Sequence, residues 1–400
     1  MMESAPTAET VYQGVYAMFN TQNMTERQKA TKWLEDFQNS VYSWQIADEL
    51  LQQKRDRESC FFAAQTMRNK IQYSFHELPD DAHISLRDSL IAHISQINDD
   101  THPTIVTQLC LALADLALLM SRWDNPVCSL IERLSRSENS LWPLINIITF
   151  LPEEIGSRNL RLGENRRDEI HKQLESNSKW VLGLLTDSLT KYAQQNPDKV
   201  HLILKCFTSW ICVHAVDVRD TANNLIVIEC FNLLNNPETD VKLHEVASDL
   251  LCSFLQCLEN EDAPAIEKQM YQNVGALEQA YRLSVVHEDI DKSMNFCRIF
   301  STLSESFLYK MMETSIEQQP HYAIKSLDLV LNCVTHYDYE VSEITFSLWY
   351  RLSEELYQKN NDQLSYYFQP YIERLLTSLY RMSQIDPDHD GLLKDDESFT

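Results

Sequence analysis

The hydrophobic residues of this chain recur at spacings of three and four, the period of amphipathic helices. The clearest run covers residues 25–72, where three such segments follow one another with almost no residues between them. Trp33, Leu34 and Phe37 mark the apolar face of the first segment. Helices this short need neighbours to cover their apolar faces. The pattern therefore predicts a packed array of helices.

The helical period continues almost to the end of the chain, and prolines separate most of the apolar segments. Taken in pairs, the segments recur every 40 residues or so, which is the period of HEAT repeats. We therefore expect an all-α, right-handed superhelical solenoid of about eight antiparallel HEAT helix pairs. The expected helices cover residues 8–20, 26–38, 42–53, 58–76, 81–97, 103–121, 126–136, 140–151, 165–193, 198–215, 219–235, 240–259, 264–286, 288–314, 320–335, 339–358 and 362–384.

Composition supports this interpretation and limits the function. The 400 residues include only 6 Gly, too few for many hairpin turns, and no flexible linker divides the chain. The net charge of −25 argues against nucleic-acid binding through a basic surface and against attraction to membranes. No apolar run reaches the length of a membrane span. Most of the 10 Cys fall on apolar faces, so we expect reduced core thiols of an intracellular protein, for example Cys110, Cys206, Cys230 and Cys252.

The sequence contains no recognisable catalytic or cofactor motif. GxSxG, the Walker A loop and HExxH are all absent, so we expect a protein that is not an enzyme and needs no cofactor. His-Glu pairs at 76–77, 244–245 and 287–288 lack a second histidine at the required spacing, and we interpret them as solvated or capping pairs. Trp33, Trp44 and Trp349 lie on apolar faces and are expected to pack in the core.

An arginine cluster interrupts the pattern at residues 158–167. One interpretation is a loop whose arginines pair with nearby acids such as Glu153, Glu154 and Asp168. The other is a contact with an acidic or phosphorylated partner, because the guanidinium fork matches carboxylate and phosphate.

The acidic segment 386–397 fits the calcium-loop pattern D-x-D-x-D-G-x₅-E in full. Against a calcium site stand Pro387, the lack of a partner hand and the three residues that follow Glu397, too few for the exiting helix. An acidic loop that faces a basic partner is the preferred interpretation, and a solvated disordered tail is the third. The weak calcium alternative would use Asp386, Asp388, Asp390 and Glu397.

Several stretches resemble the importin-β (karyopherin-β) superfamily, most closely its branch that imports arginine-serine-rich splicing factors. The N-terminal match runs through RQKATKWLEDFQ at 27–38 and ESCFFAAQTMRNKIQ at 58–72. The resemblance extends over essentially the whole chain. The other matching stretches are LRDSL (86–90), VTQLCLALADLAL (106–118), LPEEIGSRNLRLGENRR (151–167), HEVASD (244–249), DKSMNFCRIF (291–300) and FSLWYRLSEELY (346–357).

The resemblance implies a nuclear import receptor that shuttles between cytoplasm and nucleus through the nuclear pore. Because such receptors are about twice this length, we expect the N-terminal half, which in the family binds Ran-GTP. Arginine-serine-rich splicing factors would be the cargo, with their main contacts outside this chain, and nucleoporins are possible partners. The residues expected to contact Ran-GTP are Gln65, Arg68, Asn69, Lys70, Arg158, Arg161, Arg166, Arg167, Asp395, Asp396 and Glu397.

On this basis we divide the chain into three parts. Residues 1–121 would hold the N-terminal, candidate Ran-binding repeats, 122–385 the continuing repeats and 386–400 the acidic loop or tail. Ran-GTP and cargo would prefer different curvatures of the solenoid, so that each alters the affinity for the other. The alternative function is a cytosolic HEAT scaffold without a GTPase partner, of the phosphatase-regulatory kind.

Overall fold

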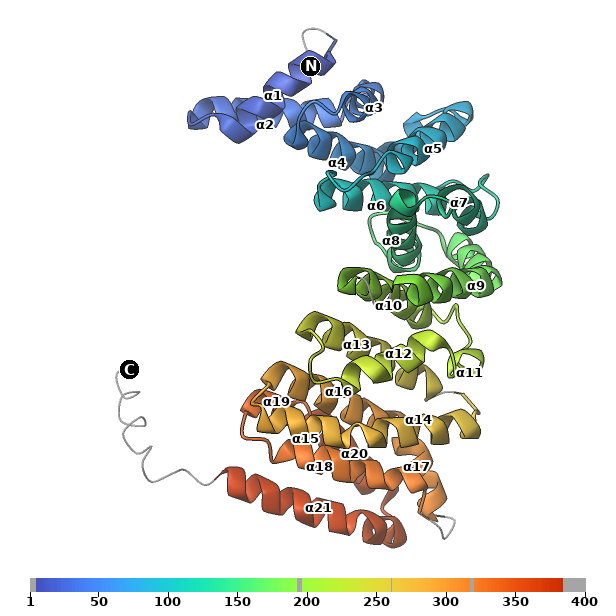
Figure 1. Cartoon of the computed structure of the whole chain (residues 1–400), viewed down its shortest axis with the longest axis vertical. Coiled ribbons are helices and arrows are strands. Elements are labelled where there is room, and N and C mark those ends of the chain that lie inside the picture. The colour runs from blue at the N-terminus through green and yellow to red at the C-terminus, as the bar shows by residue number, and fades with distance from the viewer. Residues whose placement is uncertain (1–4, 193–195, 260, 317–319, 384–400) are drawn as a thin grey trace. The chain divides into compact units, whose positions relative to one another are not determined.

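The computed structural model describes residues 5–192, 196–259, 261–316 and 320–383. Every regular element in these ranges is helical, and they contain no strand. The chain divides into two compact units, Met1–Val216 and Asp217–Thr400. Each unit is a stack of antiparallel helix pairs (Figure 1). The prediction of an all-α HEAT-type solenoid is confirmed.

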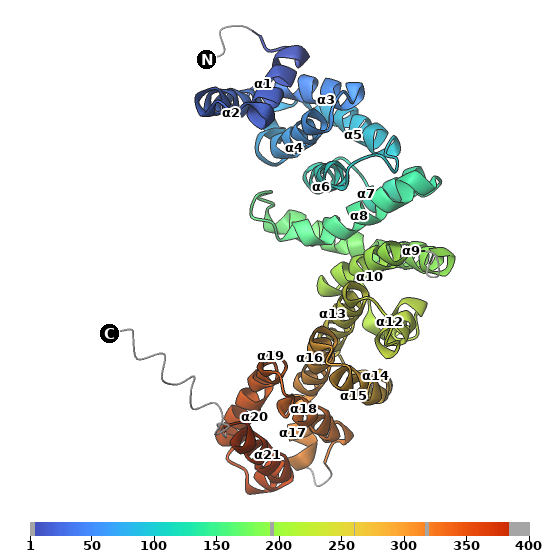
Figure 2. The ribbon, with the colours of Figure 1, turned by 60° about the vertical axis from the view of Figure 1, so that its left-hand side comes forward.

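The first unit has two layers of helices (Figure 2). The even-numbered helices α4, α6, α8 and α10 pack against one another in succession, and each also packs against the odd-numbered helix that precedes it. The unit contains α1 (Ala8–Asn20), α2 (Met24–Gln38), α3 (Ser43–Gln53), α4 (Arg57–Ser74), the short 3₁₀ helix η1 (Phe75–Glu77), α5 (Asp80–Ser95), α6 (Pro103–Leu119), α7 (Pro126–Leu134), α8 (Glu138–Ile155), α9 (Glu164–Tyr192) and α10 (Pro197–Cys212).

In the second unit, α13, α16, α18 and α21 pack in succession, and the remaining helices flank them. The unit contains α11 (Val218–Thr221), α12 (Leu225–Asn235), α13 (Val241–Leu258), α14 (Pro264–Ala276), α15 (Glu278–Val286), α16 (Ile290–Ser306), α17 (Leu308–Ile316), the 3₁₀ helix η2 (Tyr322–Lys325), α18 (Ser326–Val334), α19 (Tyr339–Glu343), α20 (Phe346–Lys359) and α21 (Asp362–Met382).

Local sequence signals explain where these helices begin. Four of them, α6, α7, α10 and α14, have proline in the first turn, where the missing N–H costs no hydrogen bond. Side-chain oxygens cap others: Asn23 accepts from the first turn of α2, and Asp56 accepts from the Ser59 amide at 2.7 Å at the start of α4. These caps fix the register in which each apolar face meets its neighbour.

The core consists of the apolar stripes that the sequence predicts. Leu34, Phe37 and Leu113 are at most 2% exposed. Trp44 and Trp349 are buried and Trp33 is half-buried, as expected of packing residues. The four cysteines predicted to be core thiols are all buried, and burial raises their pKa values, that of Cys206 to about 12.

Helix breaks are the main difference from the sequence-based expectation. The helix expected over 219–235 is two helices, because the Asn224 side chain caps a new start at α12. Breaks at Leu277 and Phe307 divide the helices expected over 264–286 and 288–314. Leu277 and Phe307 are apolar and do not interrupt the helical pattern, so periodicity alone does not reveal these two changes of direction. The expected boundary at residue 121 remains a prediction.

Among the described residues, no helix is both long and apolar enough to cross a membrane.

Candidate partner-binding site

The candidate site is the layer of even-numbered helices at the start of the first unit. It includes α2, α4 and α6, the three helices in which the sequence places the Ran surface (Figures 1 and 2). The Gln38 amide of α2 donates to the Thr66 hydroxyl of α4 at 2.9 Å. Because α4 packs extensively on α6, and α6 on α8, side chains of successive repeats can meet on this layer.

Arg68 connects three helices of the layer. Its Nε lies 3.2 Å from an Asp115 carboxylate oxygen on α6, and its Nη2 lies 3.0 Å from a Glu154 oxygen on α8. The Gln72 amide donates to the same Asp115 oxygen at 2.9 Å. Arg68 is thus engaged within the fold on two sides, and its side chain remains 21% exposed.

Asp115 is the buried centre of this network. Its side chain is fully buried, and its second oxygen, Oδ1, has no hydrogen-bond partner among the described residues. Burial and the nearby Glu154 carboxylate raise the pKa of Asp115 to about 7, although Arg68 and Gln72 favour its charged form. The ionisation of Asp115 therefore changes within the physiological pH range.

Lys70 does not lie on a solvated face. It is 2% exposed, its Nζ lies 2.6 Å from Glu77 Oε2, and the ammonium sits 5.4 Å from the centre of the Trp44 ring. The hydrogen bond from Lys70 lowers the pKa of Glu77. We expected residues 65–70 to form one solvated polar face. That expectation is wrong for Lys70, because this buried lysine holds α4 to neighbouring segments.

Gln65 and Asn69 match the expected polar face better. They lie one turn apart on α4, both are half-buried, and no hydrogen bond of either side chain is recorded in the described structure. Their amides are available to a partner. Whether they contact Ran remains a prediction.

Three exposed cations on α2 are absent from the residues singled out by sequence reasoning. Arg27, Lys29 and Lys32 are exposed, and none forms an ion pair with a described residue. Lys29 and Lys32 lie on the side of α2 opposite buried Leu34. In a chain with 59 acidic and 34 basic residues, unpaired cations are the signal that could have found them.

The arginines of the cluster at residues 158–167 have different environments in the structure. Arg158 and Arg161 are exposed, and no ion pair is recorded for either within the described ranges. Arg166 donates to the Leu118 carbonyl at 3.0 Å and pairs with Glu169 at 2.7 Å, so it fixes the start of α9 to the end of α6. Arg167 is half-buried, and its Nε has no hydrogen-bond partner in the described structure.

The acids predicted to pair with these arginines have other partners. Glu154 pairs with Arg68, and Glu153 lies 3.9 Å from Lys205 and accepts a hydrogen bond from Ser209. The intraloop pairing with Glu153 and Glu154 is therefore wrong. Arg158 and Arg161 remain available to a partner, and their contact with Ran remains a prediction.

The terminal acidic segment lies outside the described residues. This holds for Asp395, Asp396 and Glu397 and for the calcium alternative of Asp386, Asp388, Asp390 and Glu397. Elsewhere, within the part of the chain that the structure describes, no group of three or more His, Cys, Asp or Glu side chains could hold a metal ion.

One predicted solvated histidine is buried. His244 is fully buried on α13, and its Nδ1 lies 3.2 Å from the Asn295 amide nitrogen. Burial lowers the pKa of His244 to about 4, so this histidine is neutral at pH 7. The expectation of a solvated or capping pair at 244–245 is therefore wrong for His244, which packs in the core as an uncharged side chain.

Comparison with known sequence families gives three matches along the chain. Residues 30–96 match the family described as the importin-beta N-terminal domain, and residues 102–251 match the exportin 1-like protein family. Residues 288–381 match the second TPR domain of transportin-3 and importin-13. That description names both proteins and does not separate them.

Individual relatives agree with these families. The chain is 27% identical over 388 residues to the mRNA transport regulator MTR10 of Saccharomyces cerevisiae, covering 90% of this chain and 38% of that protein. It is 24% identical over 413 residues to importin-13 of Mus musculus, covering 98% of this chain and 41% of that protein. The chain thus spans about two fifths of the length of these relatives.

Among solved structures, Kap121p bound to RanGTP is similar with a TM-score of 0.43 and 14% sequence identity, over 95% of this chain and 47% of that one. The families that match successive parts of the chain, and the relatives that match nearly all of it, agree on one assignment. This chain therefore belongs to the importin-β family of nuclear transport receptors.

Proposed function

We propose that this chain is part of a nuclear import receptor and that it binds Ran-GTP through the exposed face of α2, α4 and α6. The observation that carries the proposal is the set of exposed cations on α2 with no recorded ion pair, together with the available amides of Gln65 and Asn69 on α4. Family membership supports the proposal, and so does the importin-beta N-terminal match over residues 30–96.

In this proposal, Arg68 and Lys70 position the surface and are not its main contacts. Lys70 is too buried to reach a partner, and Arg68 is held between Asp115 and Glu154. Both fix α4 against its neighbours. The direct contacts fall to side chains whose charge is not already paired.

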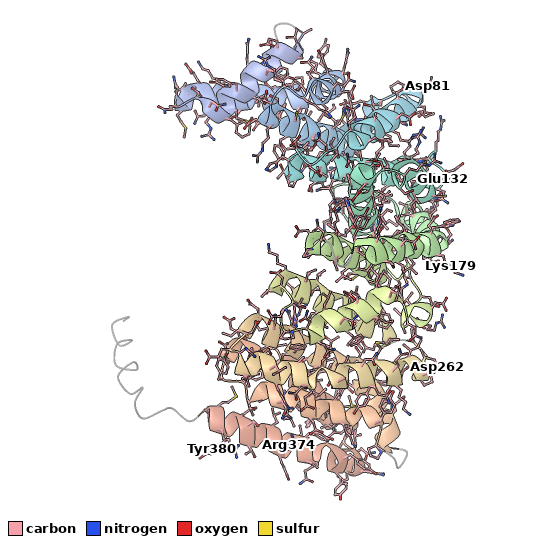
Figure 3. All side chains as sticks on the ribbon, viewed as in Figure 1. Asp81, Glu132, Lys179, Asp262, Arg374 and Tyr380 are labelled. Atoms are coloured by element: carbon pink, nitrogen blue, oxygen red, sulfur yellow. The ribbon has the colours of Figure 1, made fainter. Side chains whose placement is uncertain are left out.

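The test is the affinity for Ran loaded with GTP, measured by calorimetry. Reversal of two cations in Lys29→Glu/Lys32→Glu should weaken binding by about 1–3 kcal/mol, because it turns attraction into repulsion at the contact. The matched control is Lys172→Glu/Lys179→Glu, which reverses two exposed lysines of α9 and should change affinity much less. Figure 3 labels Lys179. Equal effects of the two variants would refute the site.

The nucleotide state of Ran tests the wider proposal. A transport receptor should retain Ran-GTP in a pull-down and not Ran-GDP. Retention of neither form would instead favour a HEAT scaffold without a GTPase partner.

We further propose that the whole protein carries arginine-serine-rich splicing factors into the nucleus, contacts nucleoporins and shuttles through the pore. Ran-GTP and cargo would act by population shift, since each would prefer a different curvature of the solenoid. Because the main cargo contacts are expected outside these 400 residues, an arginine-serine-rich domain should bind this chain weakly. Tight binding that Ran-GTP leaves unchanged would contradict the proposed mechanism.

A further inference from the structure

A cavity of about 530 Å³ lies in the first unit where the α3–α4 turn meets the α5–α6 turn. This volume is in the range of ligand sites, roughly 300–1,000 Å³. The apolar part of its lining is Leu51, Cys60, Ile97, Ile105 and Leu109. An apolar side chain that enters the cavity would be removed from water on several sides.

The polar part of the lining includes two cations. Lys54 and Arg57 are exposed and form no ion pair with any described residue, although the Lys54 ammonium lies 3.4 Å from the Gln96 carbonyl oxygen. Arg57 is also the first residue of α4, and His102 caps α6, so two long helices begin at this cavity. Their N-termini add partial positive charge.

Two acids share the lining, and they differ in their engagement. Asp56 caps α4 and accepts a hydrogen bond from the Ser59 amide at 2.7 Å. Asp100 is exposed, and no ion pair or hydrogen bond of its side chain is recorded in the described ranges. Of the two lining acids, Asp100 is therefore the one whose carboxylate has no recorded partner in the described ranges.

A buried histidine also lines this cavity. His93 is 5% exposed, and its Nε2 lies 2.8 Å from Asp48 Oδ1, which also accepts from the Ser89 hydroxyl. No partner is recorded for the other ring nitrogen, Nδ1, among the described residues. Asp48 thus holds the ring through Nε2, and Nδ1 is left to hydrogen-bond with an occupant.

We propose that this cavity binds a short acidic peptide segment of a partner protein, with one apolar side chain as its anchor. The anchor would fill the space between Leu51, Ile105 and Leu109. The acidic residues beside it would face Lys54 and Arg57, and His93 Nδ1 would contact the peptide backbone. Charge favours an acidic peptide, because Asp56 is engaged as the cap of α4, whereas Lys54 and Arg57 have no ion pair with a described residue and only the Asp100 carboxylate of the lining opposes them.

This site is separate from the proposed Ran surface. It lies at the turns that join odd-numbered to even-numbered helices, and its lining includes none of the α2 cations or the amides of Gln65 and Asn69. Its test can therefore fail while the proposed function stands, and the reverse also holds.

The test is fluorescence anisotropy of the 400-residue chain with the fluorescein-labelled peptide Glu-Asp-Phe-Leu-Asp-Glu at low salt. Lys54→Glu/Arg57→Glu should weaken binding by about tenfold or more, since two attractive charges become repulsive. Glu at position 57 also suits the first turn of α4, so unfolding is not the expected cause of a loss. The matched control is Lys172→Glu/Lys179→Glu, which removes the same charge from α9 and should leave the affinity within about twofold.

Two further arms separate the contributions of charge and anchor. Asp100→Asn should tighten binding about two- to threefold, because it removes the opposing charge. Replacing the anchoring Phe of the peptide by Ala should weaken binding about tenfold or more, because the buried apolar area is lost. Hydrogen exchange should show protection of residues 51–60 and 93–109 on addition of the peptide.

Three results would overturn the proposal. The first is no saturable binding of the peptide up to about 1 mM, the weak limit of specific recognition. The second is equal affinity in the Lys54→Glu/Arg57→Glu variant and the wild type. The third is tighter binding of a peptide with Lys in place of its acidic residues.

Discussion

Removing Arg68 should destabilise the first unit by an amount that increases with pH. The perturbation is Arg68→Met, which keeps much of the side-chain volume but removes the guanidinium between Asp115 and Glu154. Breaking a buried ion pair typically costs about 3–5 kcal/mol. Asp115 can avoid most of that cost by binding a proton, because burial and Glu154 already raise its pKa to about 7.

The magnitude follows from the free energy of protonating Asp115. At pH 6 the carboxyl is mostly protonated in the folded wild type, so the variant loses the hydrogen bonds from Arg68 to Glu154 and to a neutral Asp115, about 1 kcal/mol each. At pH 8, one unit above a pKa of about 7, protonation costs a further 1.4 kcal/mol or so. The loss should therefore increase by about 1.4 kcal/mol between pH 6 and pH 8.

The direction of this pH dependence agrees with the linkage between proton binding and stability. The folded pKa of Asp115 lies above the ordinary value of 3.8, so its contribution to stability is fully present below that value and is lost as the pH rises through about 7. Without Arg68 the folded pKa rises further. The variant therefore holds its proton to higher pH and loses stability relative to the wild type across this interval.

The assay is hydrogen exchange of the α4, α6 and α8 amides at pH 6, 7 and 8, corrected for the intrinsic exchange rate. Local exchange suits a solenoid, in which repeats can open separately. In the Asp115→Asn background, the cost of Arg68→Met should no longer depend on pH. A loss that is equal at pH 6 and pH 8, or a pH dependence that survives Asp115→Asn, would refute the reasoning.

Three further predictions concern packing, thiol chemistry and metal binding. Leu113→Ala should cost about 2–5 kcal/mol and speed exchange in α4, α6 and α8 first, because it leaves a cavity in the core; a uniform increase along the chain would contradict a linear array. Iodoacetamide should modify exposed Cys212 early and Cys230 only on unfolding, because burial raises the pKa of the Cys230 thiol; mass spectrometry shows the order. Calorimetry should detect no calcium site tighter than about millimolar, and a micromolar site abolished by Glu397→Gln would overturn the acidic-loop interpretation.

Much of the fold could be predicted from the sequence because apolar spacing and proline positions both act locally. The helix expected over 8–20 coincides with α1, and the one expected over 103–121 begins with Pro103 as α6 does. The breaks at Leu277 and Phe307 could not be predicted, since neither residue interrupts the helical pattern. Tertiary packing sets the direction of the chain at those positions.

The candidate site was less predictable, because the burial and ion pairing of a charged side chain depend on residues far along the chain. Lys70 and Arg68 look alike in sequence, yet Lys70 is buried against Glu77 and Trp44, and Arg68 finds its acids 47 and 86 residues away. The cations of α2 became notable only when the structure recorded no ion pair for any of them. Identifying unpaired charges requires the tertiary contacts.

The most direct test of the central claim is a hydrogen-exchange footprint of Ran on this chain. We expect Ran-GTP to slow exchange in peptides from α2, α4 and α6, and Ran-GDP at the same concentration to leave it unchanged. Protection that is absent with Ran-GTP, the same with both nucleotides, or confined to other helices such as α9 would contradict the central claim.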